Sequence, residues 1–112
     1  MDLTNDQKLV LETVGKFIPT KEFGIKKAYA RTKDDKSIEF LFTVNKEKFD
    51  DSVSYIQSFI SIMQRSLDHI DIEVSIYIDE EKRKKVLNEV VKKENYWEAS
   101  LSQSLFVVPS VA

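Results

Sequence analysis

The stretch KEKFDDSVSYIQSFISIMQRSLDHIDIEVSIYI, residues 46–78, contains two kinds of hydrophobic periodicity in succession. In its first part, apolar residues recur every three or four positions, as on one face of an α-helix. They are Phe49, Val53, Ile56, Phe59, Ile60, Met63 and Leu67. Asn45 is a suitable N-cap, because its side-chain oxygen can accept a hydrogen bond from the first helical turn. We therefore predict a long amphipathic helix that ends near Leu67.

The second part of the stretch, Ile70 to Ile78, changes to a period of two. Its even positions are all isoleucine or valine, whereas its odd positions are Asp71, Glu73, Ser75 and Tyr77. Successive side chains of a β-strand point to opposite faces of the sheet, so this pattern predicts a strand with one buried face.

Local signals predict the remaining elements. Thr4 and Gln7 form a capping-box pair that begins a helix ending at Ile18, because Pro19 cannot continue it. A hairpin is expected from strands at residues 25–31 and 37–44, which follow Gly24 and are joined by a polar turn. A third helix is expected at residues 80–93, with Asp79 as its N-cap. The tail is expected to add a short strand at residues 105–108, which Pro109 ends and which could start as early as Trp97.

The hairpin strands predict which side chains face the core. On the second strand, Ile38, Phe40, Phe42 and Val44 are expected inside. The first strand leaves two choices, with either Ala28 and Ala30 or Ile25 and Tyr29 inside. We favour the alanines, because small side chains let a helix lie close to the strand.

Composition indicates an ordinary globular domain. The 112 residues are 42% hydrophobic and 32% charged, with a formal net charge of −2 and no cysteine. A general nucleic-acid binder normally has a basic excess, and disulfides or thiolate metal sites need cysteine. We find neither a signal peptide nor an apolar run long enough to span a membrane, and therefore expect a single soluble domain in the cytoplasm.

The predicted fold class is α+β. The order is helix, strand, strand, helix, strand, helix, strand, forming a two-layer sandwich with a roughly four-stranded mixed sheet and helices on one face.

Two surfaces remain as candidate interaction sites. The outward face of such a sheet mixes aromatic, aliphatic and charged groups, a composition that protein interfaces use. Its candidate contact residues are Tyr29, Arg31, Glu39, Leu41, Glu73 and Tyr77. The flank of the long helix is the second candidate, because small side chains let another backbone approach closely. Its candidate self-association residues are Ser54, Tyr55, Ser58 and Ile62.

The first functional hypothesis is accordingly a non-enzymatic protein-binding domain, such as a small inhibitor, adaptor or chaperone-like protein. Its partner would be another protein, or a second copy in a homodimer. We expect no cofactor, because neither a phosphate-binding glycine loop nor a metal-ligand motif occurs.

Two alternatives belong to other classes. The single histidine, His69, lies beside Asp68 and near Asp71, and a carboxylate next to an imidazole is part of a general base or a metal site. The basic run Lys82-Arg83-Lys84-Lys85, with Lys92 and Lys93, could bind nucleic acid. Glutamates interleave with this run, so we expect a solvated helix face there instead.

Overall fold

The computed structural model describes residues 3–17, 23–100 and 105–106. The helices are α1 (Asn5–Phe17), the 3-10 helix η1 (Lys46–Lys48), α2 (Phe49–Ser66) and α3 (Glu81–Lys93). The strands are β1 (Ile25–Arg31), β2 (Ser37–Val44), β3 (Asp71–Ile78), β4 (Trp97–Ser100) and β5 (Leu105–Phe106).

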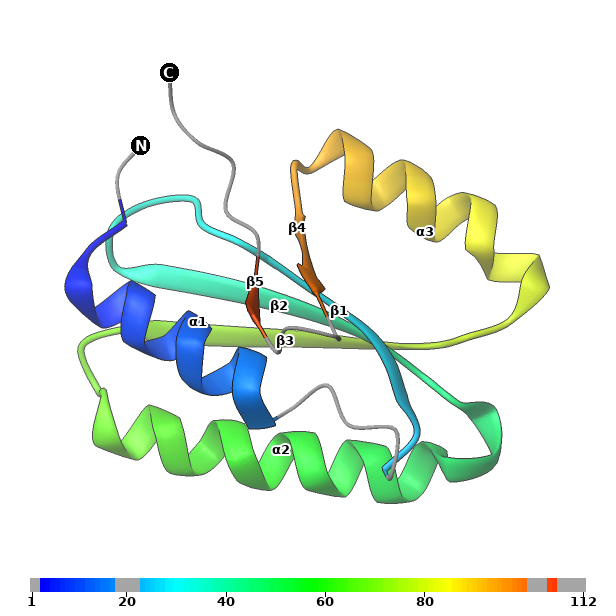
Figure 1. The fold of residues 1–112 in the computed structure, drawn as a ribbon, viewed down its shortest axis with the longest axis horizontal. Helices are drawn as coiled ribbons and strands as arrows, with labels where there is room; N and C mark the ends of the chain where they lie inside the picture. Colours follow the sequence, from blue (N-terminus) through cyan, green and yellow to red (C-terminus); the bar gives the residue numbers. More distant parts are fainter. Residues whose placement is uncertain (1–2, 18–22, 101–104, 107–112) are drawn as a thin grey trace.

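The strands form one mixed sheet in the order β3-β2-β1-β4-β5 (Figure 1). β2 and β3 are parallel, whereas the pairs β1–β2, β1–β4 and β4–β5 are antiparallel. The α+β class, the element order and the mixed sheet are thus confirmed. The tail contributes two short strands in place of one; residues 107–109, which include the predicted end at Pro109, lie outside the described residues, as do Ile18 and Pro19.

The long helix forms where the periodicity places it. Asn45 caps η1 through its Oδ1, which accepts from the N–H of Glu47 at 3.0 Å, and η1 runs directly into α2. Gln64 then fixes the turn into β3. Its Nε2 donates to the carbonyl of Ile70 at 2.5 Å, and its Oε1 accepts from the N–H of Ile72 at 2.9 Å. A side chain of α2 therefore fixes the position of the first residues of β3 relative to the end of the helix.

The central strand of the core is β2. All its residues from Ile38 to Val44 are buried, whereas in β3 Ile72 is buried and Val74, Ile76 and Ile78 are half-buried. The difference follows from position, because β2 has neighbours on both sides and β3 lies at the end of the sheet.

The two choices for β1 are both partly realised. Ala28 and Ala30 face the core, as we favoured, and Tyr29 points to the opposite face. A register shift between Ile25 and Lys27 also turns Ile25 into the core.

The capping box holds α1 and anchors it to the hairpin. The N–H of Gln7 donates to Thr4 Oγ1 at 3.1 Å, and the N–H of Thr4 donates to Gln7 Oε1 at 3.0 Å. The Nε2 of Gln7 also donates to the carbonyls of Asp34 and Ser37, at 2.7 and 3.1 Å. One buried side chain thus begins the helix and attaches it to the β1–β2 turn.

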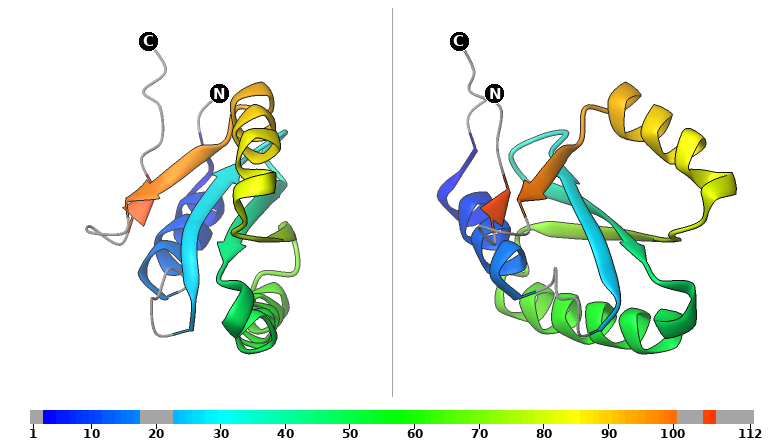
Figure 2. Two further views of the ribbon diagram at one scale, coloured as in Figure 1. Left: turned by 90° about the vertical axis from the view of Figure 1, so that its right-hand side faces the viewer. Right: turned by 45° about the vertical axis from the view of Figure 1, so that its right-hand side comes forward.

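The third helix differs from expectation in its place and in its cap. α1 and α2 pack on one face of the sheet, whereas α3 lies over the opposite face (Figure 2). The helix starts one residue late, and its N-cap residue is Glu80 without a side-chain cap bond. Asp79 is not the cap, because its N–H extends the sheet by donating to the carbonyl of Val44 at 2.8 Å.

Candidate functional site

The residues predicted on the outward face of the sheet do share one face. Strand register places Tyr29 beside Leu41, and Arg31 beside Glu39, which pairs in turn with Glu73. The face is not open, however. Tyr29, Glu39 and Leu41 are buried, because α3 and the segment that follows it cover them, although Tyr29 also lines a cavity under α3. Glu73 and Tyr77 remain exposed, and Arg31 is half-buried.

Arg31 binds the segment after α3 to this face. Its Nε lies 2.5 Å from Glu39 Oε2, and its Nη1 contacts the carboxylate and the carbonyl of Glu94. The guanidinium lies over the ring of Tyr96, 4.9 Å from the centroid. These contacts are made within the chain, so they support a structural role for Arg31 and Glu39.

Two neighbouring carboxylates have opposite pKa shifts. Burial disfavours the ionised form of Glu39, but hydrogen bonds from Lys33, at 2.8 Å, and from Arg31 outweigh it, so the pKa of Glu39 is lowered. The pKa of Glu73 is raised, first by its hydrogen bond with Glu39 and then by the charges of Glu39 and Asp71. The stability of this face therefore depends on pH.

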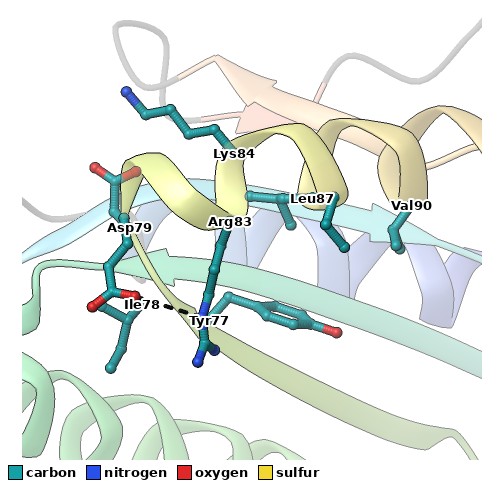
Figure 3. A pocket seen from close by; sticks show the side chains of 9 residues that line it. Tyr77, Ile78, Asp79, Arg83, Lys84, Leu87 and Val90 are labelled. Carbon is teal, nitrogen blue, oxygen red and sulfur yellow. Dashed lines mark ion pairs between the residues drawn. The ribbon is translucent and has the colours of Figure 1, made fainter.

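Beside this cluster, an apolar groove runs between α3 and the C-terminal end of β3 (Figure 3). We call it the α3 groove, and define it by its apolar lining of Tyr77, Ile78, Val86, Leu87 and Val90. Its volume is about 270 Å³. Tyr77 is 38% exposed and Val86 is 61% exposed, so both can be reached from solvent.

The charged residues at the groove are paired with one another. Arg83 Nε lies 3.5 Å from Glu80 Oε2, the ion pair dashed in Figure 3, and Lys84 Nζ lies 3.0 Å from Glu81 Oε1. These glutamates neutralise half of the predicted basic run Lys82 to Lys85. These two ion pairs reduce the positive charge that this part of α3 presents to solvent.

Behind the groove, Tyr29 lines a second cavity of about 280 Å³ under α3. Burial, with smaller contributions from the charges of Glu98 and Asp79, raises the pKa of Tyr29 to about 12. The phenol stays protonated at neutral pH.

The predicted flank of α2 forms a second surface. Ser54, Tyr55, Ser58 and Ile62 line one broad, shallow depression together with Phe23 and Phe59. The rings of Phe23 and Tyr55 lie 4.2 Å apart, and the Tyr55 hydroxyl donates to the carbonyl of Phe17 at 2.7 Å. We call Phe17, Phe23, Tyr55, Phe59 and Ile62 the aromatic patch. Sequence reasoning missed Phe17 and Phe23, because tertiary packing alone brings them to α2.

The acidic neighbours of His69 in the structure are not all those that the sequence predicted. His69 Nε2 lies 2.5 Å from Asp6 Oδ2 of α1, and Nδ1 lies 3.7 Å from Asp68 Oδ1. The hydrogen bond with Asp6 is the main cause of the raised pKa of His69. Asp71 makes its described hydrogen bond through its backbone, to the carbonyl of Lys36. Asp6 precedes His69 by 63 residues, so no local pattern indicated it.

The described residues also bear on the requirements of a metal site and of a membrane-spanning helix. Within them, no group of three or more His, Cys, Asp or Glu side chains is placed to hold a metal ion. No helix in this described part of the chain is both long enough and apolar enough to cross a membrane.

Comparison of the chain with protein-family models, with curated proteins and with solved structures finds no match. The candidate surfaces therefore rest on geometry and chemistry alone.

Proposed function

We propose that this protein is a non-enzymatic protein-binding domain, and that the α3 groove receives an apolar side chain of its partner. The observation that carries the proposal is the incomplete packing of α3. None of its thirteen residues, all within the described part of the chain, is buried, although the helix has a continuous apolar stripe.

The chemistry of the groove suits a protein partner. Aromatic and aliphatic side chains line it, and paired charges surround it, which is the arrangement of an interface core and its polar rim. An inserted side chain would remove Tyr77 and Val86 from water, and burial of one large apolar side chain contributes about 1.5–3 kcal/mol. Binding of this kind needs neither a cofactor nor a catalytic group. The cysteine-free composition is consistent with a cytoplasmic setting.

The aromatic patch is a second candidate surface for the same function. It is supported by exposed Phe17 and Ile62, which are 52% and 63% exposed. The patch is wide and shallow, whereas the groove is enclosed enough to hold a side chain, and we therefore rank the groove first.

Selection of random peptides displayed on phage, with the intact chain as bait, tests the proposal. Enriched peptides should carry a large apolar anchor, and Val86→Glu should weaken their binding at least tenfold in fluorescence anisotropy. Val86 is exposed and glutamate favours helices, so the variant should retain its circular dichroism spectrum and melting temperature.

The matched control is Ile62→Glu, an equally exposed aliphatic residue on α2. It should change affinity less than twofold. A reversed result, with binding lost in Ile62→Glu and kept in Val86→Glu, would move the site to the aromatic patch. Failure to enrich any peptide would contradict binding through an apolar anchor.

A further inference from the structure

The edge of the sheet at β3 lacks most of the features that normally prevent strands from pairing, although it carries the charged residues Asp71 and Glu73. Edge strands are usually short, bulged, or interrupted by proline or lysine. β3 is eight residues long and pairs with β2 at all eight positions in unbroken register. Its sequence, DIEVSIYI, contains no proline, lysine or arginine. The edge at the other end of the described sheet is β5, with two residues.

The backbone of β3 presents hydrogen-bonding groups to this edge. Parallel strands use the N–H groups of alternate residues. The N–H groups of Asp71 and Asp79 donate toward β2, to the carbonyls of Lys36 and Val44, both at 2.8 Å. The odd positions of β3 therefore face β2, and the even positions face outward.

One of the outward N–H groups is already used. Ile72 donates to Gln64 Oε1 at 2.9 Å. The N–H groups of Val74, Ile76 and Ile78 remain directed to the open side. Their side chains are half-buried, so a further strand would also shield aliphatic surface that α2 leaves partly exposed.

We propose that β3 pairs with β3 of a second copy in antiparallel orientation, with Ser75 on the two-fold axis. This register places Val74 opposite Ile76 of the second copy, and Ile72 opposite Ile78. The outward amides of Val74 and Ile76 then exchange hydrogen bonds across the interface.

The self-complementary pairing of aliphatic positions favours this occupant and this orientation. In the antiparallel register Glu73 lies opposite Tyr77 of the second copy, and the like charges of Asp71 and Asp79 meet only at the two ends of the contact. A parallel copy on the same edge would set the outward-facing even positions opposite odd ones, which places aliphatic side chains beside Asp71 and Glu73. The antiparallel contact uses the same edge of both copies, so assembly closes at two.

The proposed contact shares Tyr77 and Ile78 with the α3 groove but not the residues of α3, so it can be tested separately. A two-fold axis perpendicular to the sheet keeps corresponding faces on the same side, so both grooves would open on one side of a continuous sheet. Val86→Glu is accordingly expected to leave dimerisation unchanged, and the two proposals can fail separately.

Single-cysteine variants test the register, since the natural chain has no cysteine to interfere. Ser75→Cys places two thiols at the axis, within the Cα separation of about 4.4–6.8 Å that a disulfide needs. Asp71→Cys is the matched control on the same exposed face. At about 3.3 Å per residue its two copies would lie roughly 26 Å apart. Under mild oxidation, Ser75→Cys should give a cross-linked dimer and Asp71→Cys should not.

Analytical ultracentrifugation of the unmodified chain should show a concentration-dependent dimer, and Ser75→Lys should weaken it at least tenfold. The side chain of Ser75 is exposed, so this change should not disturb the fold. Hydrogen exchange at Val74, Ile76 and Ile78 should slow as protein concentration rises.

Several results would overturn the proposal. They are a monomer at all concentrations, equal cross-linking of both cysteine variants, or a dimer that Ser75→Lys leaves intact. If the edge amides became protected from hydrogen exchange only when an enriched peptide was added, the β3 edge would pair with a strand of another protein and not with a second copy.

Discussion

On one face of the sheet, α1 and α2 enclose a core in which Phe40, Phe42 and Ile56 are at most 1% exposed. On the other face, α3 covers Tyr29 and Leu41 but buries none of its own residues, all of which the structure describes. The same strands therefore support a closed layer and an incompletely packed one. A helix completes a core when its apolar face is wide, as that of α2 is. The apolar face of α3 is narrower, because the helix has only four aliphatic residues among its lysines and glutamates.

The ends of α3 explain how it stays in place without a core. The N–H of Asp79 bonds to β2 at one end, and Arg31 binds Glu94 at the other. The middle of the helix can leave a groove beneath it. We infer that the first face stabilises the fold and that the second is available for binding.

Core truncation should give the largest difference between the two faces. Phe40→Ala is expected to lower the free energy of unfolding by about 3–5 kcal/mol, because it leaves a cavity in close-packed surroundings. Leu87→Ala, on the half-buried stripe of α3, should cost about 1 kcal/mol. Denaturant unfolding monitored by circular dichroism measures both. Equal losses would mean that α3 packs in solution as tightly as α2 does.

The attachment of α1 provides the next test. Gln7→Met keeps the volume of the side chain but leaves two hairpin carbonyls without their donor and removes the capping box, and it should cost about 2–3 kcal/mol. Thr13→Ala, in the same helix, removes a bond to the carbonyl of Leu9 and should stay within about 0.5 kcal/mol. Unfolding curves of both variants should preserve this order; a small loss for Gln7→Met would show that packing alone holds α1.

The face on which α1 and α2 pack could be predicted well, because the sequence patterns that indicate its elements are local. Alternation located β1 and β2 with their observed ends, 25–31 and 37–44, and the three-to-four spacing located α2. The capping pair Thr4–Gln7 lies within four residues of sequence. Each of these features depends on neighbours along the chain, which a sequence displays directly.

The face that α3 covers could not be predicted in the same way. The stripe of Val86, Leu87 and Val90 would look the same for a helix on either side of the sheet, since periodicity gives the apolar face of a helix but not the layer it joins. Asp79 has the chemistry of an N-cap, yet its backbone extends the sheet and the helix begins later. Tertiary contacts decided both outcomes.

Charge on the face that α3 covers allows a pH test that distinguishes two neighbouring carboxylates. The pKa of Glu39 is lowered, so its stabilising contribution is present above its ordinary value of about 4.3 and is lost as pH falls through the folded value. Glu39→Gln should therefore cost about 1–3 kcal/mol at pH 7, and less near pH 3.

Glu73 should behave in the opposite way. Its pKa is raised, so the stability associated with its protonated form is present at low pH and is lost as pH rises through the folded value. Glu73→Gln should then be neutral or slightly stabilising at pH 7. Unfolding free energies measured from pH 3 to pH 7 compare the two variants. A destabilised Glu73→Gln protein at pH 7 would show that Glu73 is paired and not repelled.

The smallest expected effect is at the contact between α1 and the α2–β3 turn. Asp6 raises the pKa of His69, so the contact stabilises the fold below the ordinary histidine value of about 6.5 and is lost as pH rises through the folded value. Asp6→Asn should return the pKa of His69 toward that ordinary value, measured by NMR titration. Because both side chains are about half exposed, 1 M salt should have much the same effect on the unmodified protein. Asp68→Asn is the control, since Asp68 lies farther away and is almost fully exposed. If Asp68→Asn lowered the pKa of His69 more than Asp6→Asn did, the main partner of His69 would be Asp68 in its own turn. The contact with Asp6 would then contribute nothing to holding α1 against the sheet.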